Sequence, residues 1–202
     1  ISAPANSQII RAAPGPDNTY ALRDAFDARV SATIGLAWDG NRFLTFERKH
    51  KRVLALHPET GHSSLLLNLA DLDPTGRPMI FLADDAEITD LAWGRGLLWL
   101  ACKAGYSSAL YALDAQAGAV TLCVPARGPE PTGIAFDAQE EHFWTVDARN
   151  REFSQFTLQG AWTRLAIPTP IQQPMRLALD DNGRFWTVDG ETNRVYQIAG
   201  ER

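Results

Sequence analysis

The sequence predicts an all-β fold: a β-propeller of four four-stranded blades in which the N-terminal segment closes the last blade. Two observations predict this fold. One alanine-centred segment recurs four times, and each copy is followed by short apolar runs that turn residues separate. The last three copies begin 43 residues apart, which is the length of one propeller blade.

The alanine-centred segment is the first and innermost strand of each predicted blade. Its four copies are Gly35–Asp39, Asp90–Gly94, Gly133–Asp137 and Arg176–Asp180. In each copy the alanine follows Leu or Ile and precedes a large residue. Because side chains alternate across a strand, the alanine faces one neighbouring blade and the bulky pair faces the other. Because blades converge toward an axis, a small side chain of one blade must face a large side chain of the next blade near that axis. An ordinary antiparallel sandwich, the alternative fold, does not require one size pattern four times.

The second run follows a tight turn in every unit. Its copies are Arg42–Glu47, Leu97–Cys102, His142–Asp147 and Arg184–Asp189. The last two share the string Phe-Trp-Thr-Val-Asp. Gly and Asn residues in the preceding turns tolerate the positive φ that tight hairpins need.

A third run occurs in all four units and a fourth run in three of them. The third runs are Arg52–Leu56, Ala109–Leu113, Glu152–Phe156 and Arg194–Ile198; the fourth runs are Ser64–Leu69, Ala119–Val124 and Trp162–Ile167. Prolines separate later units, because proline cannot donate to a β-ladder. Each unit is therefore a four-strand meander.

These runs set the predicted boundaries within a single domain. The repeats cover about 34–88, 89–131, 132–174 and 175–202, and residues 1–33 supply the missing outer strand of the last unit. An insertion near Asp71–Asp85 explains the longer interval of 55 residues between the first two copies. Five blades, or part of a larger propeller, remain open as alternatives.

Composition limits the function classes. Hydrophobic residues make up 45% and charged residues 21%, as in soluble globular proteins. The net charge of −5 gives no reason to expect nucleic acid as a partner, and no apolar run is long enough to span a membrane. The small, polar opening Ile1–Asn6 is typical of exported proteins after signal cleavage, and equally of a chain cut at its start. The oligomeric state is not indicated.

Two strings resemble known propeller families. Pro131–Asp137 followed by Phe143–Asp147 resembles the NHL and YVTN repeats and the wider group of gluconolactonases and strictosidine synthase-like proteins. The resemblance implies a propeller in which the loops entering the inner strands share one face with the loops joining second to third strands. It also implies one candidate activity, that of a divalent-metal-dependent hydrolase or lyase of the lactonase-like kind.

That implied face contains the candidate binding residues. The second runs end at Glu47, Cys102, Asp147 and Asp189, and Asp90 and Arg176 open two inner strands. Carboxylates that converge on one mouth could bind a divalent cation such as calcium, or a cationic ligand. Glu47, Asp147 and Asp189 are the candidate metal ligands. The alternative, which the repetition favours, is that each carboxylate caps its own loop through backbone N–H groups.

Three further expectations concern single residues. Arg176 is expected to pair with Asp189 or with a ligand carboxylate. Cys102 and Cys123 are expected to be free thiols because a strand lies between them, and Cys102 is expected to be the more exposed. Trp162, on an outer strand, is expected to be partly exposed.

The favoured function is a non-catalytic propeller that binds a protein or a small ligand through one face. The sequence carries no recognisable catalytic triad, P-loop or dinucleotide fingerprint. No cofactor is expected apart from the open case of a divalent cation. The alternatives are the metal-dependent hydrolase or lyase and a structural role in a larger assembly.

Overall fold

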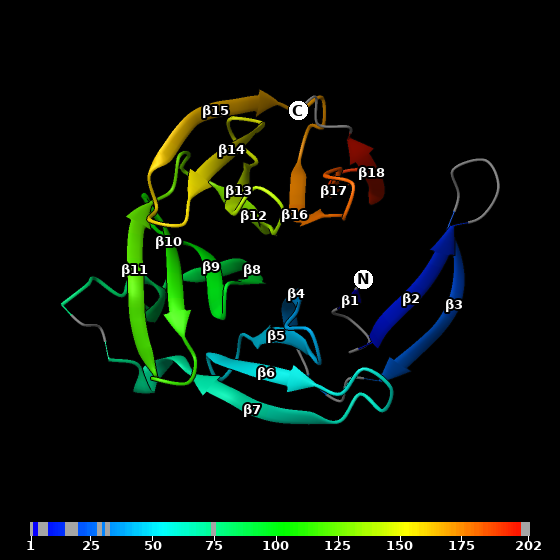
Figure 1. The fold of residues 1–202 in the computed structure, drawn as a ribbon, viewed down its shortest axis with the longest axis horizontal. Coiled ribbons are helices and arrows are strands. Elements are labelled where there is room, and N and C mark those ends of the chain that lie inside the picture. The colour runs from blue at the N-terminus through cyan, green and yellow to red at the C-terminus, as the bar shows by residue number, and fades with distance from the viewer. Residues whose placement is uncertain are drawn as a thin grey trace. The chain divides into compact units, whose positions relative to one another are not determined.

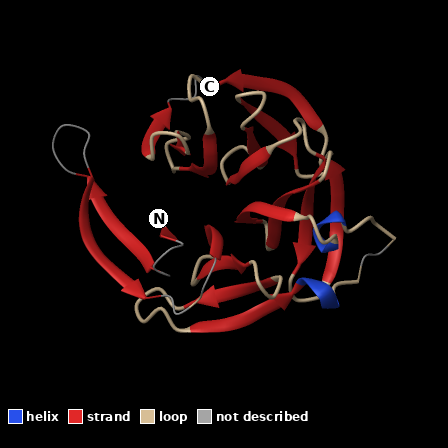
Figure 2. Ribbon diagram, turned by 180° about the vertical axis from the view of Figure 1, so that it is seen from behind, coloured by secondary structure: helices blue, strands red, loops and turns tan. Residues whose placement is uncertain are grey.

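Four antiparallel sheets, one for each predicted repeat, follow an N-terminal three-stranded sheet along the described chain and confirm the predicted all-β fold of propeller type (Figures 1 and 2). The computed structural model describes residues 2–3, 8–14, 20–27, 30, 33–73 and 76–198. Apart from two short 3₁₀ helices, Leu69–Asp71 (η2) and Ile80–Leu82 (η3), its regular elements are strands. None of the described helices is long and apolar enough to cross a membrane.

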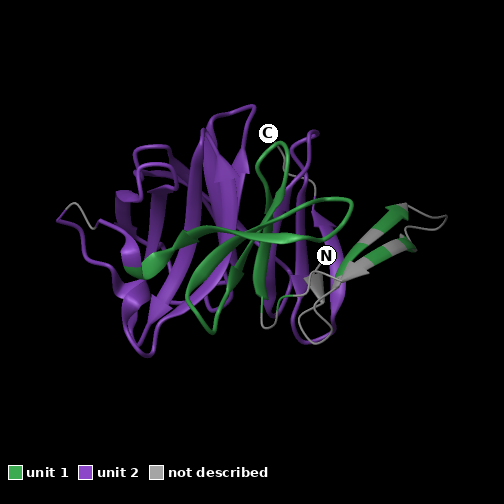
Figure 3. Ribbon diagram, turned by 90° about the horizontal axis from the view of Figure 1, so that it is seen from below, with its two compact units in different colours: residues 1–70 green, residues 71–202 purple. Residues whose placement is uncertain are grey.

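The chain divides into two compact units, residues 1–70 and residues 71–202 (Figure 3). The first contains two sheets. The first repeat sheet has the order β4-β5-β6-β7, and three N-terminal strands pair with one another in the order β1-β2-β3. The strands are β1 (Ser2–Ala3), β2 (Gln8–Pro14), β3 (Tyr20–Asp27), β4 (Thr33–Trp38), β5 (Phe43–Glu47), β6 (Arg52–Leu56) and β7 (Ser63–Asn68).

The second unit contains three repeat sheets. Two have four strands, and the last has three among the described residues, as the missing fourth run predicts. The strands are β8 (Glu87–Gly94), β9 (Leu97–Ala104), β10 (Ser107–Asp114), β11 (Ala119–Pro125), β12 (Pro131–Asp137), β13 (His142–Asp147), β14 (Glu152–Thr157), β15 (Trp162–Pro168), β16 (Pro174–Leu179), β17 (Phe185–Asp189) and β18 (Arg194–Ile198). Closure of this last sheet by the N-terminal segment, and the single domain it implies, stay predictions.

The inner strands of the second unit lie side by side, with β12 between β8 and β16 and the outer strands β11 and β15 away from them (Figure 1). The expected pairing of small with large side chains is present. Ala92 of β8 packs in one core cluster with Ile134 of β12, and Ala135 of β12 packs in another with Leu177 of β16. The alanine of each blade therefore makes room for the branched residue of the next.

Aromatic rings from the second and third strands fill the space between these blades. Phe143 stacks on Phe156, with ring centroids 5.2 Å apart, and its other neighbour is Trp99 of the preceding blade at 4.4 Å. In the next interface Phe153 stacks on Phe185 at 4.9 Å. Burial of such rings is the main apolar contribution to a core of this kind.

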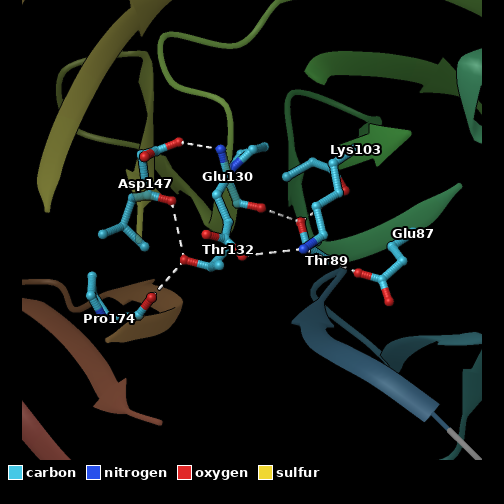
Figure 4. Close-up of polar contacts among 10 residues, drawn as sticks. Glu87, Thr89, Lys103, Glu130, Thr132, Asp147 and Pro174 are labelled. Carbon is cyan, nitrogen blue, oxygen red and sulfur yellow. Dashed lines mark hydrogen bonds and ion pairs between the residues drawn. The ribbon is translucent and has the colours of Figure 1, made fainter. Parts of the chain in front are cut away.

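A repeated hydrogen bond also joins neighbouring inner strands. The hydroxyl of Thr89 donates to the carbonyl of Pro131 at 2.6 Å, and the hydroxyl of Thr132 donates to the carbonyl of Pro174 at 2.6 Å (Figure 4). Both threonines stand one residue before the alanine-centred segment. Each hydroxyl thus supplies a donor to the first carbonyl of the next inner strand. We call these two bonds the threonine latches.

The predicted insertion covers the outer edge of the sheet β8–β11. Asp73 pairs with the backbone of β11, accepting from Val120 N at 3.0 Å. Phe81 of η3 is buried and meets the ring of Tyr111 edge-on at 4.7 Å, while the Tyr111 hydroxyl donates to the carbonyl of Pro78 at 2.9 Å. An exposed sheet edge is a site for unwanted strand pairing, and the insertion removes it here.

We expect Thr132→Val to lower the free energy of unfolding by about 1 kcal/mol or more, because valine keeps the shape and leaves the carbonyl of Pro174 without its donor. Thr121→Val is the matched control: its hydroxyl bonds within its own blade, to the carbonyl of Ala112, and Thr121 is an exposed residue of the outer strand β11. Urea unfolding of the two variants tests the threonine latch. Equal stability of the two variants would show that the latch contributes nothing.

Candidate functional site

Each inner strand of the second unit begins with an irregularity in its pairing with the second strand. The pairing register shifts between Ile88 and Asp90, between Pro131 and Gly133, and between Met175 and Ala178. Bulges of this kind turn a side chain out of the regular alternation. The register skips Thr89, Thr132, and Arg176 with Leu177, so the candidate Arg176 lies in such an irregularity. The candidate Asp90 follows one directly and is paired with Ala101.

The inner strands approach one another so closely here that Gly133 has no room for a side chain. A Cβ atom at Gly133 would lie 2.6 Å from the carbonyl carbon of Arg176 and 2.7 Å from the nitrogen of Leu177. Glycine is required by this approach, since such contacts do not occur between real Cβ atoms and backbone. The site is therefore built largely from backbone.

Asp90 is a buried carboxylate that joins three inner strands. Only 3% of the residue is exposed. Its Oδ2 accepts hydrogen bonds from the backbone nitrogen of Ile134 in β12 at 3.2 Å and from that of Leu177 in β16 at 3.3 Å, and the carboxylate also accepts from its neighbour Leu91 in β8. One carboxylate thus satisfies three backbone donors from three blades.

Burial dominates the ionisation of this group. Loss of hydration raises the pKa of Asp90 to about 6, while the positive charge of Arg176 and the three backbone N–H groups act in the opposite direction. Among the described carboxyl groups with a shifted pKa, Asp90 is the one whose pKa is raised by burial. The usual direction is shown by Asp189, where hydrogen bonds outweigh the cost of desolvation and lower the pKa.

Arg176 stands on strained backbone beside this carboxylate. Its φ is 62°, in the left-handed region, where a residue with a side chain costs about 1–3 kcal/mol. The guanidinium donates to the carbonyl of Thr89 and its charge acts on Asp90. The expected partner Asp189 instead bonds to its own loop, so the prediction of an Arg176–Asp189 pair is wrong.

Asp147 and Asp189, which end second strands, accept backbone hydrogen bonds from their own loops, and Asp147 also accepts one from the loop that enters β12. Asp147 accepts from the backbone nitrogens of Glu130 and Asn150, both at 2.7 Å. Asp189 accepts from Glu191 N at 3.0 Å and from the Thr192 hydroxyl at 2.9 Å.

Glu47 also interacts with neighbouring residues along the chain, but its partners are side chains and not backbone N–H groups. It binds Arg52 at 2.8 Å and His50 at 3.0 Å, and these bonds outweigh the cost of desolvation and lower its pKa. Capping through backbone N–H groups of the own loop therefore describes Asp189 and one of the two Asp147 bonds, whereas Glu47 pairs with side chains. Among the described residues, no group of three or more His, Cys, Asp or Glu side chains could hold a metal ion. Metal or ligand binding by Glu47, Asp147 and Asp189 stays a prediction.

Both cysteines are free, as expected, but their exposure is the reverse of the expectation. Cys102 is fully buried and Cys123 is partly exposed. This repeat position is buried in every blade, since Glu47, Asp147 and Asp189 are buried as well. In addition, β9 continues two residues past Cys102 to Ala104, whereas the equivalent strands end at their acidic residue. Cys102 is therefore inside a strand and not at its end.

A polar surface network that the sequence did not reveal lies at the same end of the blades. Lys103 of β9 bridges Glu87 at 3.3 Å and Glu130 at 3.2 Å (Figure 4). Burial opposes the charge on Lys103, but these bonds outweigh it and raise its pKa. Three residues further along the same hairpin, Tyr106 is fully exposed. We call Glu87, Lys103, Tyr106 and Glu130 the loop face. Its members lie outside the repeated positions, so no repeat signal marks them.

Comparison with known proteins supports the fold. No protein-family model and no curated protein matches the sequence. Solved structures do match over nearly the whole chain. They include a chain of a nidogen/laminin complex (TM-score 0.59, 12% identity, 96% of this chain and 72% of that one). Virginiamycin B lyase from Staphylococcus aureus with quinupristin gives a TM-score of 0.58 at 16% identity, with 98% and 61% coverage.

A luciferin-regenerating enzyme gives a TM-score of 0.56 at 15% identity, covering 97% of this chain and 66% of that one. The chain thus spans about three fifths to two thirds of the length of the two enzymes. At these identities the likeness shows the fold alone, and the lyase and the regenerating enzyme are β-propellers like this chain.

The raised pKa of Asp90 has a measurable consequence. Its folded pKa of about 6 lies above the ordinary value of 3.8, so the stability it contributes is complete below pH 3.8 and is lost as the pH rises through 6. Relative to Asp90→Asn, the wild-type protein should lose about 3 kcal/mol between those limits. Urea unfolding of both proteins across this range measures it, and the subtraction removes the contribution of other carboxyls. A difference that does not change with pH would contradict this account of Asp90.

Proposed function

We propose that this protein is a non-catalytic β-propeller-type binding protein that recognises a protein partner through the loop face of residues 71–202. The observation that carries the proposal is the surface arrangement of that face: a fully exposed tyrosine on a hairpin, three residues beyond a lysine that holds two exposed carboxylates. Such a combination of a large amphipathic anchor with a polar rim is typical of protein recognition sites.

The charge of the loop face indicates the kind of partner. Glu87 and Glu130 are both more than 40% exposed, and the one positive charge between them belongs to Lys103. The chain as a whole carries a net charge of −5. A partner surface with excess positive charge and an apolar recess for Tyr106 would be complementary to it.

The comparisons are compatible with this role. One of the solved chains of similar fold comes from a nidogen/laminin complex, so a fold like this one occurs in an assembly of proteins. In addition, the candidate metal-binding carboxylates Asp147 and Asp189 already accept hydrogen bonds from neighbouring loops. The loop face, in contrast, presents its groups to solvent.

Substitution of Tyr106 tests the proposal. We expect Tyr106→Ser to weaken partner binding by about 30-fold, because loss of a central tyrosine anchor costs about 2 kcal/mol. Leu165→Ser is the matched control, since Leu165 is also exposed but lies on the outer strand β15. Quantitative affinity enrichment with the three proteins, followed by titration of the purified partner, measures the effect. A partner that Tyr106→Ser retains, or that Leu165→Ser loses equally, rejects the loop face as the site.

A second candidate function is a divalent-metal-dependent hydrolase or lyase. The observation in its favour is that virginiamycin B lyase and the luciferin-regenerating enzyme share the fold. Its metal ligands would be Glu47, Asp147 and Asp189, with calcium as the candidate ion.

Calcium titration separates the two functions. If the carboxylates are loop caps, calcium leaves Tm unchanged at constant ionic strength, and Asp147→Ala lowers the stability by about 1–3 kcal/mol without any metal, because two backbone N–H groups lose their acceptor. A saturable rise in Tm that Asp189→Asn abolishes would instead favour the metal-dependent enzyme.

A further inference from the structure

Three backbone N–H groups at equivalent repeat positions converge on one point in the second unit. Leu91, Ile134 and Leu177 each follow the residue that opens an alanine-centred segment, in β8, β12 and β16 respectively. All three donate to the carboxylate of Asp90, two of them to the same oxygen at 3.2 and 3.3 Å. The quasi-symmetry of the repeat therefore places three donors around one acceptor.

This arrangement has the chemistry of an anion site. Backbone N–H groups that point to one position form a concave region of positive potential, and a carboxylate can accept several such bonds at once. Because the donors belong to the backbone, they stay in place whichever side chain occupies position 90. We call the three N–H groups the amide cradle.

Comparison of the repeats separates the amide cradle from the carboxylate that it binds. Position 90 corresponds to Gly35 in the first copy and to Gly133 in the third, and neither has a side chain. Asp90 alone among the four equivalent residues is a carboxylate. The backbone donors thus recur in the three copies of the second unit, whereas the anion that they bind comes from one residue.

Arg176 supplies a second, independent indication. It holds the remaining equivalent position with a φ of 62°, close to the φ of 65° of Gly35. A glycine would relieve this strain. The arginine persists beside the cradle, where its charge favours an anion, and it is the charged side chain that acts on Asp90. From β12 the facing group is the backbone N–H of Ile134.

We propose that the meeting point of β8, β12 and β16 is a carboxylate-binding site and that the side chain of Asp90 is its built-in ligand. Removal of that side chain opens the site to a small free carboxylate such as formate or acetate. The site belongs to three blades at once, so its occupancy couples them. It is distinct from the loop face and does not depend on the proposed function.

Chemical rescue tests the proposal. Asp90→Gly removes the carboxylate and installs the residue that Gly133 holds in the next copy. Sodium formate, titrated at constant ionic strength against sodium chloride, should raise the Tm of Asp90→Gly by several degrees in a saturable manner. The wild-type protein should not respond, and neither should Asp90→Asn, whose side chain still fills the cradle. A folded Asp90→Gly protein that formate does not stabilise more than it stabilises the wild type overturns the proposal.

A measurement on the wild-type protein decides the matter if Asp90→Gly does not fold. Burial raises the pKa of Asp90 to about 6, so its charge changes under mild conditions. The backbone amide resonances of Leu91, Ile134 and Leu177 should then shift with one common midpoint as the pH is lowered, and should stay unchanged in Asp90→Asn. Different midpoints, or no shift at Ile134 and Leu177, would show that the three donors do not share one acceptor.

Discussion

Backbone polar groups on the inner strands of residues 71–202 must find partners away from water, and this requirement ties the blades to one another. Buried donors and acceptors that stay unpaired are costly. Bulges at the start of β8, β12 and β16 take several of these groups out of regular pairing. Partners then come from neighbouring blades: the Asp90 carboxylate for the N–H groups of Ile134 and Leu177, and two threonine hydroxyls for the carbonyls of Pro131 and Pro174.

Apolar packing acts at the same interfaces in a complementary way. Ala92 and Ala135 leave space that Ile134 and Leu177 fill, and stacked phenylalanine rings continue the contact outward. The threonine hydrogen bonds and the alanine packing therefore recur at two successive blade interfaces because the same repeat unit forms both. Recognition of a partner requires residues that differ between the copies, because the repeated residues form the scaffold. The residues that differ between copies, such as Lys103 and Tyr106, are the ones left for recognition.

Sequence reasoning predicted the parts of the fold that repeat. Local patterns are enough to define the strands, because each strand can be predicted from its own residues. These patterns are the alanine-centred segments, the Phe-Trp-Thr-Val-Asp strings and the turn residues. Capping by Asp147 and Asp189 was also predictable, because a recurring acidic residue at a strand end has a local role. The exposure expected for Cys102 was wrong because the end of the second strand is a buried position, as Glu47, Asp147 and Asp189 also show. The position of Asp90 was visible, but its burial and its three donors depend on strands far apart in sequence.

Native-state hydrogen exchange measures most directly whether the inner strands fasten the three blades into one unit. The amides of Leu91, Ile134 and Leu177 belong to different blades and share one acceptor. If the blades depend on one another, these amides exchange with a single free energy of opening, the highest in residues 71–202, and respond equally to denaturant. Separate free energies for the three amides, each matching the rest of its own blade, would contradict that dependence.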